Sequence, residues 1–243
     1  MELWGKTALI TGGGIRLGRA FAIALAKEGV NLIIHYNSSK EPAVATAQEA
    51  QNLGVKAITI GANFSDPSAV QGVFTEALKK FPYVDVLINN AAVYLKGNGL
   101  ETNLVTWEKE FRINLQAPFI LTQEFARQLP QDRLGRVLNI ADAQIIQHKT
   151  DHFVYRLTKS ALVEMTRQFA IELAPQITVN ALAPGIMLPL AGKKEADLKT
   201  YTEKHVPLKR SGSPEIAAEN GLHLIKSDFT TGAFLRVDGG QYL

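Results

Sequence analysis

The chain has 243 residues, 46% hydrophobic and 20% charged, which excludes disordered, collagen-like and coiled-coil proteins. Its formal net charge of +3 comes from dispersed Lys and Arg without a long basic run, so it suits an anionic small molecule as well as nucleic acid. Cys is absent, which excludes disulfides, thiolate metal sites and Cys nucleophiles, and the five scattered His form no zinc pattern.

Short aliphatic segments alternate along the chain with longer segments whose apolar positions recur every three to four residues. This alternation predicts an α/β protein. The aliphatic segments are almost continuously apolar, as parallel strands covered on both faces should be. We expect strands at residues 6–11, 30–36, 55–60, 84–89, 136–140, 177–181 and 233–237. We expect helices at about 17–28, 42–53, 67–80, 107–129, 153–174 and 214–226.

Two of these helices have clear start signals. Asp66 precedes Pro67 and Ser213 precedes Pro214, so each helix begins with a capping side chain and a Pro near its first position. These pairs predict helix starts close to residues 67 and 214.

Neither a Gly/Ser linker, nor a charge block, nor an internal repeat interrupts the pattern, so we expect one domain over residues 1–243. The longest irregular segment, at about 186–206, lies between the sixth strand and the last helix. Long loops in compact domains are usually functional, and parallel sheets bind ligands at the carboxyl ends of their strands. We therefore expect 186–206 to be a substrate-binding loop.

A glycine-rich segment directly follows the first predicted strand and leads into an amphipathic helix. It reads Thr11-Gly12-Gly13-Gly14-Ile15-Arg16-Leu17-Gly18. Glycines here allow positive φ and let backbone amides and the helix N-terminus approach a pyrophosphate. A plain glycine-rich turn is the alternative, but the strand before it and the helix after it favour a dinucleotide site.

The second predicted strand ends without the acidic residue that NAD enzymes use to bind the ribose 2′-hydroxyl. Instead Arg16, Asn37, Ser38 and Ser39 offer donors and positive charge for a 2′-phosphate. The Asn-Ser-Ser segment also suits a polar turn and a helix cap, and the two roles are compatible. We expect NADP(H) to be the cofactor.

Tyr155 and Lys159 lie four residues apart, on one face of a predicted helix. A free phenol has a pKa near 10, and a neighbouring cation lowers it. We therefore expect Tyr155 to exchange a proton with a substrate, while Lys159 also reaches the nicotinamide ribose. A Tyr-x-x-x-Lys pair by itself is more often a solvated helix face. In this chain it follows the glycine turn, the segment Asn89-Asn90-Ala91-Ala92 and Asn114.

In this order and spacing, the motifs resemble the short-chain dehydrogenase/reductase family over essentially the whole chain. The matching residues are Thr11-Gly12 with Gly18, Asn89-Asn90-Ala91, Asn114, Tyr155 with Lys159, Pro184-Gly185 and Val237-Asp238-Gly239-Gly240. The resemblance implies a Rossmann-like, doubly wound, seven-stranded parallel sheet and hydride transfer with a nicotinamide. It also implies a homotetramer, or a dimer, assembled through the two long central helices.

Two departures from the common family pattern are similar to the pteridine reductase branch. Arg16 stands where the family usually has Gly, and Asp142 stands 13 residues before Tyr155, where the family has a catalytic Ser. In that branch the Arg contacts the cofactor phosphates and the pterin, and the Asp works with the Tyr to protonate a ring nitrogen. The compact chain resembles bacterial dihydromonapterin or dihydropteridine reductases more than trypanosomatid pteridine reductases.

The resemblance assigns roles to individual residues. Tyr94 matches the aromatic position that sandwiches a pterin against the nicotinamide, and Lys159 and Asn114 are expected to support a water-linked proton relay. Expected catalytic residues are Asp142, Tyr155, Lys159 and Asn114. Expected substrate contacts are Arg16, Tyr94, Asp142, Tyr155 and Leu188. Expected cofactor contacts are Gly12, Gly14, Ile15, Arg16, Leu17, Gly18, Tyr36, Asn37, Ser38, Ser39, Asn63, Phe64, Asn90, Ala91, Ala92, Tyr155, Lys159, Pro184, Gly185 and Met187.

Asp142 also has a chemical rationale that is independent of the family. Reducing a C=N bond needs hydride at carbon and a proton at nitrogen, and a carboxyl group beside a phenol can deliver that proton. We therefore expect an NADPH-dependent reductase that converts a dihydropterin to a tetrahydropterin. The alternatives are an NADPH-dependent reductase of ketones or 3-oxoacyl thioesters, in which Asp142 is incidental, and a non-catalytic NADP-sensing protein. The last would be expected to have lost Tyr155 and Lys159.

The apolar runs fall short of the roughly 20 residues that cross a bilayer. The start of the chain lacks the basic and apolar regions of a secretory signal. We expect a cytoplasmic enzyme with a small pterin-like substrate and without a membrane, nucleic-acid or metal partner.

Overall fold

The computed structural model describes residues 1–189 and 194–243. Seven strands form one parallel sheet in the order β3-β2-β1-β4-β5-β6-β7. The prediction of a single-domain, Rossmann-like, doubly wound sheet is confirmed, and β6 runs on to Pro184 instead of ending at residue 181. The strands are Thr7–Ile10 (β1), Asn31–Tyr36 (β2), Ala57–Gly61 (β3), Val86–Asn89 (β4), Gly135–Ile140 (β5), Ile177–Pro184 (β6) and Phe234–Val237 (β7).

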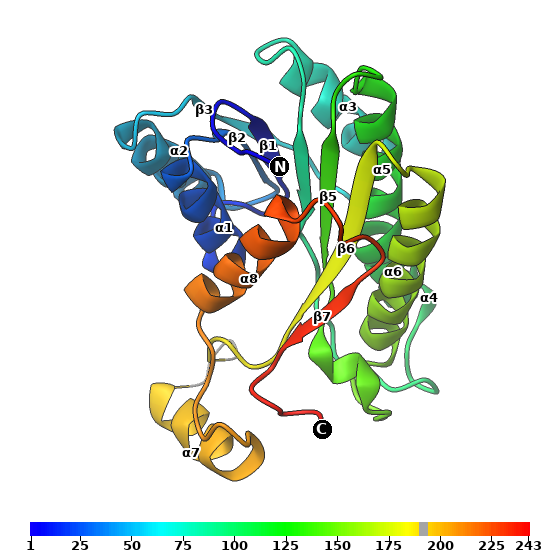
Figure 1. Cartoon of the computed structure of the whole chain (residues 1–243). Coiled ribbons are helices and arrows are strands. Elements are labelled where there is room, and N and C mark those ends of the chain that lie inside the picture. Colours follow the sequence, from blue (N-terminus) through cyan, green and yellow to red (C-terminus); the bar gives the residue numbers. More distant parts are fainter. Residues whose placement is uncertain (190–193) are drawn as a thin grey trace.

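Helices cover both faces of the sheet (Figure 1). On one face lie α1 (Arg16–Lys27), α2 (Lys40–Asn52) and α8 (Pro214–Lys226). On the other lie α3 (Pro67–Leu78), α5 (Ala117–Gln128) and α6 (Phe153–Glu172), with α4 (Leu104–Phe111) leading into α5. None of the described helices is both long and apolar enough to cross a membrane.

The core lies in two layers because successive strand residues point to opposite faces. Ile10 and Ile34 pack under α1, α2 and α8, whereas their neighbours Leu9 and Ile33 pack under α3, α5 and α6. All four side chains are completely buried. The sheet is therefore held from both sides, and the loops at its carboxyl ends start from a rigid base.

The predicted starts of α3 and α8 are confirmed. Asp66 accepts a hydrogen bond from the N–H of Ser68, and Ser213 accepts one from the N–H of Ile216. Both caps satisfy an amide that a helix leaves unpaired at its first turn.

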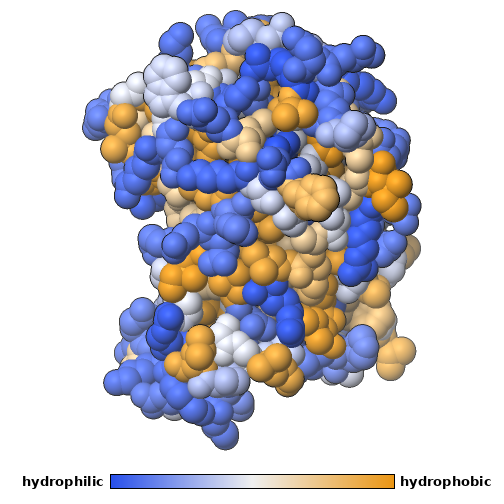
Figure 2. Space-filling model, viewed as in Figure 1, coloured by the Kyte–Doolittle hydropathy of each residue, from blue (hydrophilic) through white to orange (hydrophobic). Residues whose placement is uncertain are grey.

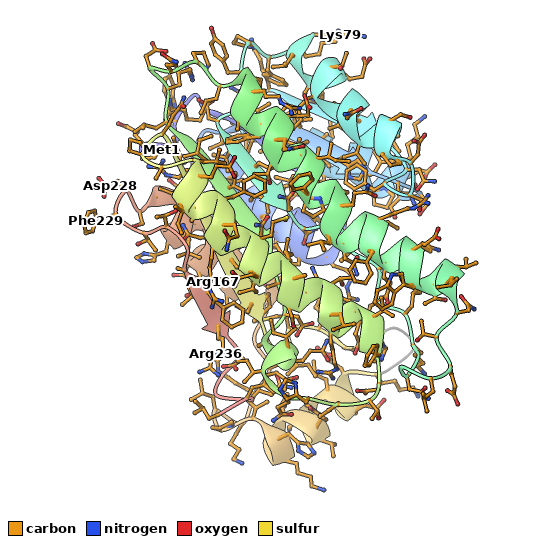
Figure 3. The ribbon with its side chains drawn as sticks, turned by 90° about the vertical axis from the view of Figure 1, so that its right-hand side faces the viewer. Met1, Lys79, Arg167, Asp228, Phe229 and Arg236 are labelled. Carbon is orange, nitrogen blue, oxygen red and sulfur yellow. The ribbon has the colours of Figure 1, made fainter. Side chains whose placement is uncertain are left out.

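The predicted helix over 107–129 is interrupted in its middle. It begins at Leu104 and passes through a π-helical turn, Arg112–Gln116 (η1), before α5. Pro118 has no N–H to donate to the carbonyl of Asn114, and the N–H of Ala117 donates instead to Arg112, five residues back. Asn114 thus lies in an irregular, buried turn beside α6, and Figure 3 shows α6 running alongside this helix.

The loop predicted at about 186–206 is wrong over residues 195–205, which form α7 (Glu195–His205). Acidic residues in its first turn and basic residues in its last complement the helix dipole. Only Leu198 and Thr202 of α7 are buried, so the apolar period was too weak to reveal it. Residues 190–193 of the predicted loop lie outside the described residues. α7 stands off the sheet in Figure 1, and Figure 2 shows apolar surface between it and the rest of the molecule.

Candidate active site

A groove of about 430 Å³ lies at the carboxyl ends of β1, β2 and β4. No Asp or Glu is found among the described residues that line it, so it suits a ligand with several phosphates. Most residues predicted to bind a dinucleotide line the groove: Gly12, Gly14, Ile15, Arg16, Leu17, Gly18, Tyr36, Asn37, Ser38, Ser39, Phe64, Asn90, Ala91 and Ala92. His35, Val93 and Ile113 complete the lining.

The glycine turn has little room for side chains. Gly12 has a φ of +62°, and a Cβ at Gly18 would overlap the carbonyl oxygen of Gly12, so both positions require glycine. Asn90 ties the turn to the end of β4, because its Nδ2 donates to the carbonyls of Thr11 and Gly12. The hydroxyl of Thr11 accepts the N–H of Asn90 over 2.8 Å in return. The shape of the glycine turn is therefore fixed by hydrogen bonds to the end of β4.

His35 supports this turn from β2. Its Nδ1 accepts the N–H of Gly12 over 3.2 Å, and its Nε2 donates to the carbonyl of Ala62 over 3.0 Å, which places the proton on Nε2. The ring stacks on Phe64 with 3.9 Å between centroids. Burial lowers the pKa of His35 to about 4, so the ring stays neutral and remains an acceptor. The sequence contained no signal for this contact, which depends on the pairing of β1 with β2.

Arg16 adopts the left-handed backbone conformation, with a φ of +50°. This conformation normally favours glycine, so an arginine here stores strain. Its Nη2 donates to the carbonyl of Pro189 over 3.4 Å. The side chain thus joins the groove to the segment that follows β6.

Six residues predicted to contact the cofactor are absent from the lining of the groove: Asn63, Tyr155, Lys159, Pro184, Gly185 and Met187. The Oδ1 of the exposed Asn63 accepts the N–H of Ser65, and Met187 lies against Gly212 in a separate hollow. These six contacts stay predictions.

A second cavity of about 650 Å³ contains the predicted catalytic groups Asp142 and Tyr155, together with Tyr94. Its walls come from the 3-10 turn Ala143–Ile146 (η2), the start of α6, the segment after β6, α7 and the C-terminal residues. The lining residues are Tyr94, Asp142, Gln144, Lys149, Asp151, Tyr155, Arg156, Gly185, Ile186, Pro189, Asp197, Leu198, Tyr201, Gln241 and Tyr242.

Asp142 and Tyr155 are directly hydrogen-bonded. The hydroxyl of Tyr155 donates to Oδ2 of Asp142 over 2.9 Å. Asp142 also caps η2, where its Oδ1 accepts the N–H of Gln144 over 2.8 Å. Burial raises the pKa of Asp142, although its hydrogen bonds oppose the shift. A carboxyl group and a phenol therefore line the same cavity and are joined by one hydrogen bond.

The expectation that the pKa of Tyr155 is lowered toward neutral pH is wrong. Burial, and then the negative charge of Asp142, raise the pKa of Tyr155 well above its ordinary value. The ammonium of Lys159 lies 5.8 Å from the Tyr155 ring centroid and donates to the carbonyl of Ile140 over 2.6 Å. Burial lowers the pKa of Lys159 to about 8. Tyr155 thus retains its proton at neutral pH, as a proton donor must.

Tyr94 forms an aromatic wall beside this pair. Its ring stacks on His152 with centroids 3.7 Å apart, and it meets the Tyr155 ring edge-on at 4.6 Å. His152 lies in the left-handed region, and its Nδ1 is 2.7 Å from the carbonyl of Leu95. The ring of Tyr94 is thus held in place before any ligand arrives; its sandwich with a pterin stays a prediction.

The backbone that carries Tyr94 is held by two buried side chains. Asn114 accepts the N–H of Val93 over 2.8 Å and donates to the carbonyl of the same residue over 2.9 Å. Glu110 accepts the N–H of Leu95 over 3.0 Å. Because both ends of the Asn114 amide are used, its side chain positions the segment, and its role in a proton relay stays a prediction.

Leu188, predicted to contact substrate, does not line the second cavity, whereas Ile186 and Pro189 of the same segment do. Several residues that reach the cavity from distant parts of the chain were missed because no local motif marks them: Gln144, Arg156, Tyr201, Gln241 and Tyr242. Gln241 ties three of these walls together, since its Oε1 accepts the N–H of Ile186 and its Nε2 donates to the hydroxyls of Tyr201 and Tyr242.

Comparisons with known proteins find similar chains over the whole length of this one. A family model described as short chain dehydrogenase matches residues 6–198. The 3-oxoacyl-[acyl-carrier-protein] reductase FabG of Aquifex aeolicus is 33% identical over 247 positions, which cover 100% of this chain and 99% of that protein. The structure of FolM alternative dihydrofolate reductase 1 from Brucella canis, complexed with NADP, is 30% identical with a TM-score of 0.92, covering 99% of this chain and 96% of that one. A blue fluorescent protein from a metagenomic library, in complex with NADPH, is 31% identical with a TM-score of 0.91 and full coverage of both chains.

Proposed function

This chain belongs to the short-chain dehydrogenase family and is an oxidoreductase, and we propose that it is an NADPH-dependent reductase that converts a dihydropterin to a tetrahydropterin. The observation that carries this proposal is the 2.9 Å hydrogen bond between Tyr155 and Asp142 at the wall of the second cavity. A carboxyl group at this place can help deliver a proton to a ring nitrogen, whereas a Ser hydroxyl suits a carbonyl oxygen.

The groove provides the groups that NADP(H) needs. Amides of the glycine turn and the start of α1 can bind the pyrophosphate, and Ser38, Ser39 and Arg16 can donate to the 2′-phosphate. Two structural relatives were solved with NADP or NADPH, which supports this choice. When bound, NADPH supplies the hydride.

The side chains of this protein supply the proton. Burial and the charge of Asp142 keep the phenol of Tyr155 protonated, so Tyr155 enters the reaction as an acid. Once its proton has moved to the substrate, the buried ammonium of Lys159 stabilises the phenolate. Asp142 accepts from the hydroxyl of Tyr155 at the start and orients it.

The cavity suits a flat, partly polar ring. Tyr94 offers an aromatic wall, and Ile186, Pro189 and Leu198 offer apolar contacts. The last three belong to the expected substrate-binding segment, which includes α7. The relative named alternative dihydrofolate reductase supports a pterin as the substrate.

The second candidate is a reductase of 3-oxoacyl thioesters. It is favoured by curated relatives named 3-oxoacyl-[acyl-carrier-protein] reductase, such as those of Aquifex aeolicus and Staphylococcus epidermidis at 33% and 32% identity. In that reading Tyr155 protonates a carbonyl oxygen and Asp142 is incidental.

NADPH oxidation separates the two candidates. The purified protein is assayed with a 7,8-dihydropterin and, in parallel, with an acetoacetyl thioester, each repeated on Asp142→Ala and on a control variant of an exposed carboxylate, Asp132→Ala. Pterin-dependent turnover that collapses only in Asp142→Ala is the expected result. Thioester turnover that survives this change, without pterin turnover, would overturn the proposal in favour of the second candidate.

We also propose that the enzyme assembles as a homotetramer through its two long central helices. Supporting this, Trp107 and Phe119 are 38% and 42% exposed beside a hollow of about 510 Å³ between α4, α5 and α6. Contiguous exposed apolar surface of this kind marks contact sites. Sedimentation of the wild type and of Phe119→Glu tests it: a wild type that sediments as a single chain would contradict assembly.

A further inference from the structure

Two donors of one residue converge on the carboxyl group of Asp142. The backbone N–H of Gln144 donates to Oδ1 over 2.8 Å, and its side-chain Nε2 donates to Oδ2 over 2.9 Å. With Tyr155 also donating to Oδ2, three of the roughly four acceptor sites of the carboxylate are filled. Such a set of donors favours the ionised form.

Arg156 decides which end of the Gln144 amide faces Asp142. Its Nη2 donates to Oε1 of Gln144 over 3.0 Å, and its Nη1 donates to the Gln144 carbonyl over 2.7 Å. A guanidinium has no acceptor atoms, so the oxygen of the amide must face Arg156 and the nitrogen must face Asp142. The backbone carbonyl of Asp151 accepts from Nε of Arg156, and its Oδ1 accepts from Nη2. Only 11% of the Arg156 side chain is exposed, so the guanidinium lies between Asp151 and Gln144.

The other groups around Asp142 do not replace these donors. Lys159 of α6 directs its ammonium to the carbonyl of Ile140. Tyr94, after β4, and Tyr242, near the C-terminus, face Asp142 as phenols whose pKa values are raised, chiefly by burial, so they carry no charge near neutral pH. Tyr155 and Gln144 are therefore the side chains that stabilise the charge of Asp142 through hydrogen bonds within the described part of the chain.

We propose that Gln144 is a positioning residue that holds Asp142 as the carboxylate partner of Tyr155, and that Arg156 sets the amide orientation on which this depends. The network runs from Asp151 at the surface through Arg156 and Gln144 to Asp142 and Tyr155. It keeps the proton of the pair on Tyr155, which lines the second cavity.

Carbon-13 NMR of the ligand-free protein tests this without any substrate. The carboxyl carbon of Asp142 is assigned with Asp142→Asn and titrated in the wild type, Gln144→Met and Gln147→Met. Gln144→Met keeps the length of the side chain but removes its donor, so the pKa of Asp142 should rise by about one unit. Gln147 lies just after η2 with an exposed side chain, and its substitution should leave that pKa unchanged.

Further variants test the role of Arg156. Gln144→Glu can still pair with Arg156 but places a negative charge against Asp142, so it should raise the pKa more than Gln144→Met does. Arg156→Met lets the side-chain amide of Gln144 rotate, so it should raise the pKa of Asp142 by less than Gln144→Met does. Arg156→Lys should restore part of the wild-type pKa. An unchanged Asp142 pKa in Gln144→Met, or an equal rise in Gln147→Met, would overturn the proposal.

A kinetic test rests on the proposed function. Turnover of whichever substrate is reduced should fall at low pH as Asp142 becomes protonated and no longer accepts from Tyr155. In Gln144→Met this acidic limb should move to higher pH by about one unit. A lower kcat at every pH with an unmoved limb would mean a merely structural role. The pKa of Asp142 could change as expected in the NMR titrations while the protein reduces neither a pterin nor a thioester. That result would support the positioning role of Gln144 and reject the proposed reductase.

Discussion

The hydroxyl of Tyr155 lies 2.9 Å from Oδ2 of Asp142, and this bond joins the start of α6 to the end of β5. Asp142 stands immediately before η2, so its carboxyl group both caps that turn and meets the phenol. The negative charge of Asp142 therefore acts directly on the phenol and contributes to raising the pKa of Tyr155.

Replacing Asp142 by Ser should weaken the reduction of a dihydropterin and improve the reduction of a thioester carbonyl. A hydroxyl can hold a carbonyl oxygen but cannot help carry a proton to a basic nitrogen. We expect Asp142→Ser to lower kcat for a dihydropterin by on the order of 100-fold and to raise turnover of an acetoacetyl thioester. Steady-state NADPH oxidation measures both, and equal loss of both activities would contradict this expectation.

Arg16 should strengthen NADPH binding through its positive charge and lower folding stability through its left-handed backbone conformation. Both Arg16→Gly and Arg16→Ala remove the guanidinium, so both should raise KM for NADPH by roughly 10-fold or more. Only Gly relieves the left-handed φ of +50°, so the Ala variant should be less stable than the Gly variant by about 1 kcal/mol. Urea unfolding measures the difference in stability. Identical midpoints for the two variants would show that the backbone at residue 16 leaves the left-handed conformation without cost, which would contradict the prediction.

Lys159 should lower stability at neutral pH, because its buried ammonium bonds only one carbonyl among the described residues. Burial lowers its pKa from 10.5 to about 8 in the folded chain. The loss of folding stability caused by burying the charged Lys159 is therefore complete below pH 8 and disappears as the pH rises through 10.5. Lys159→Met should abolish turnover and yet stabilise the protein by about 1–3 kcal/mol at pH 7, raising Tm by several degrees.

Thermal unfolding at two pH values checks this prediction for Lys159. The gain in Tm should shrink between pH 7 and pH 10. Lys80→Met, at an exposed lysine, serves as the control and should leave Tm nearly unchanged. An equal rise in Tm at both pH values would show that side-chain packing, and not the charge of Lys159, explains the stabilisation.

His35 should make the fold sensitive to mild acid. Its pKa falls from 6.5 to about 4 on folding, so below pH 6.5 the unfolded chain takes up a proton that the folded chain does not. Stability should decrease by about 2 kcal/mol between pH 6.5 and pH 5 from this residue alone. Guanidinium unfolding at pH 7, 6 and 5 should show a smaller decrease in His35→Gln than in wild type. His205→Gln, at an exposed histidine, should behave as wild type.

Local patterns were sufficient for the fold and for the motifs. The seven strands were predicted because buried parallel strands are continuously apolar, and the starts of α3 and α8 because Asp66-Pro67 and Ser213-Pro214 act within one helical turn. α7 was missed for the same reason: with only two buried residues, it has almost no apolar period to detect.

The sequence by itself determined the family, the parallel sheet and the presence of Asp142, Tyr155 and Lys159, because these depend on residue types at short, regular spacings. Only the tertiary structure decided that the pKa of Tyr155 rises, that His35 supports Gly12, and that Gln144 and Arg156 form a network around Asp142. A pKa depends on burial, and a hydrogen bond depends on the positions of two atoms. Both are set by the packing of elements that lie far apart in the chain.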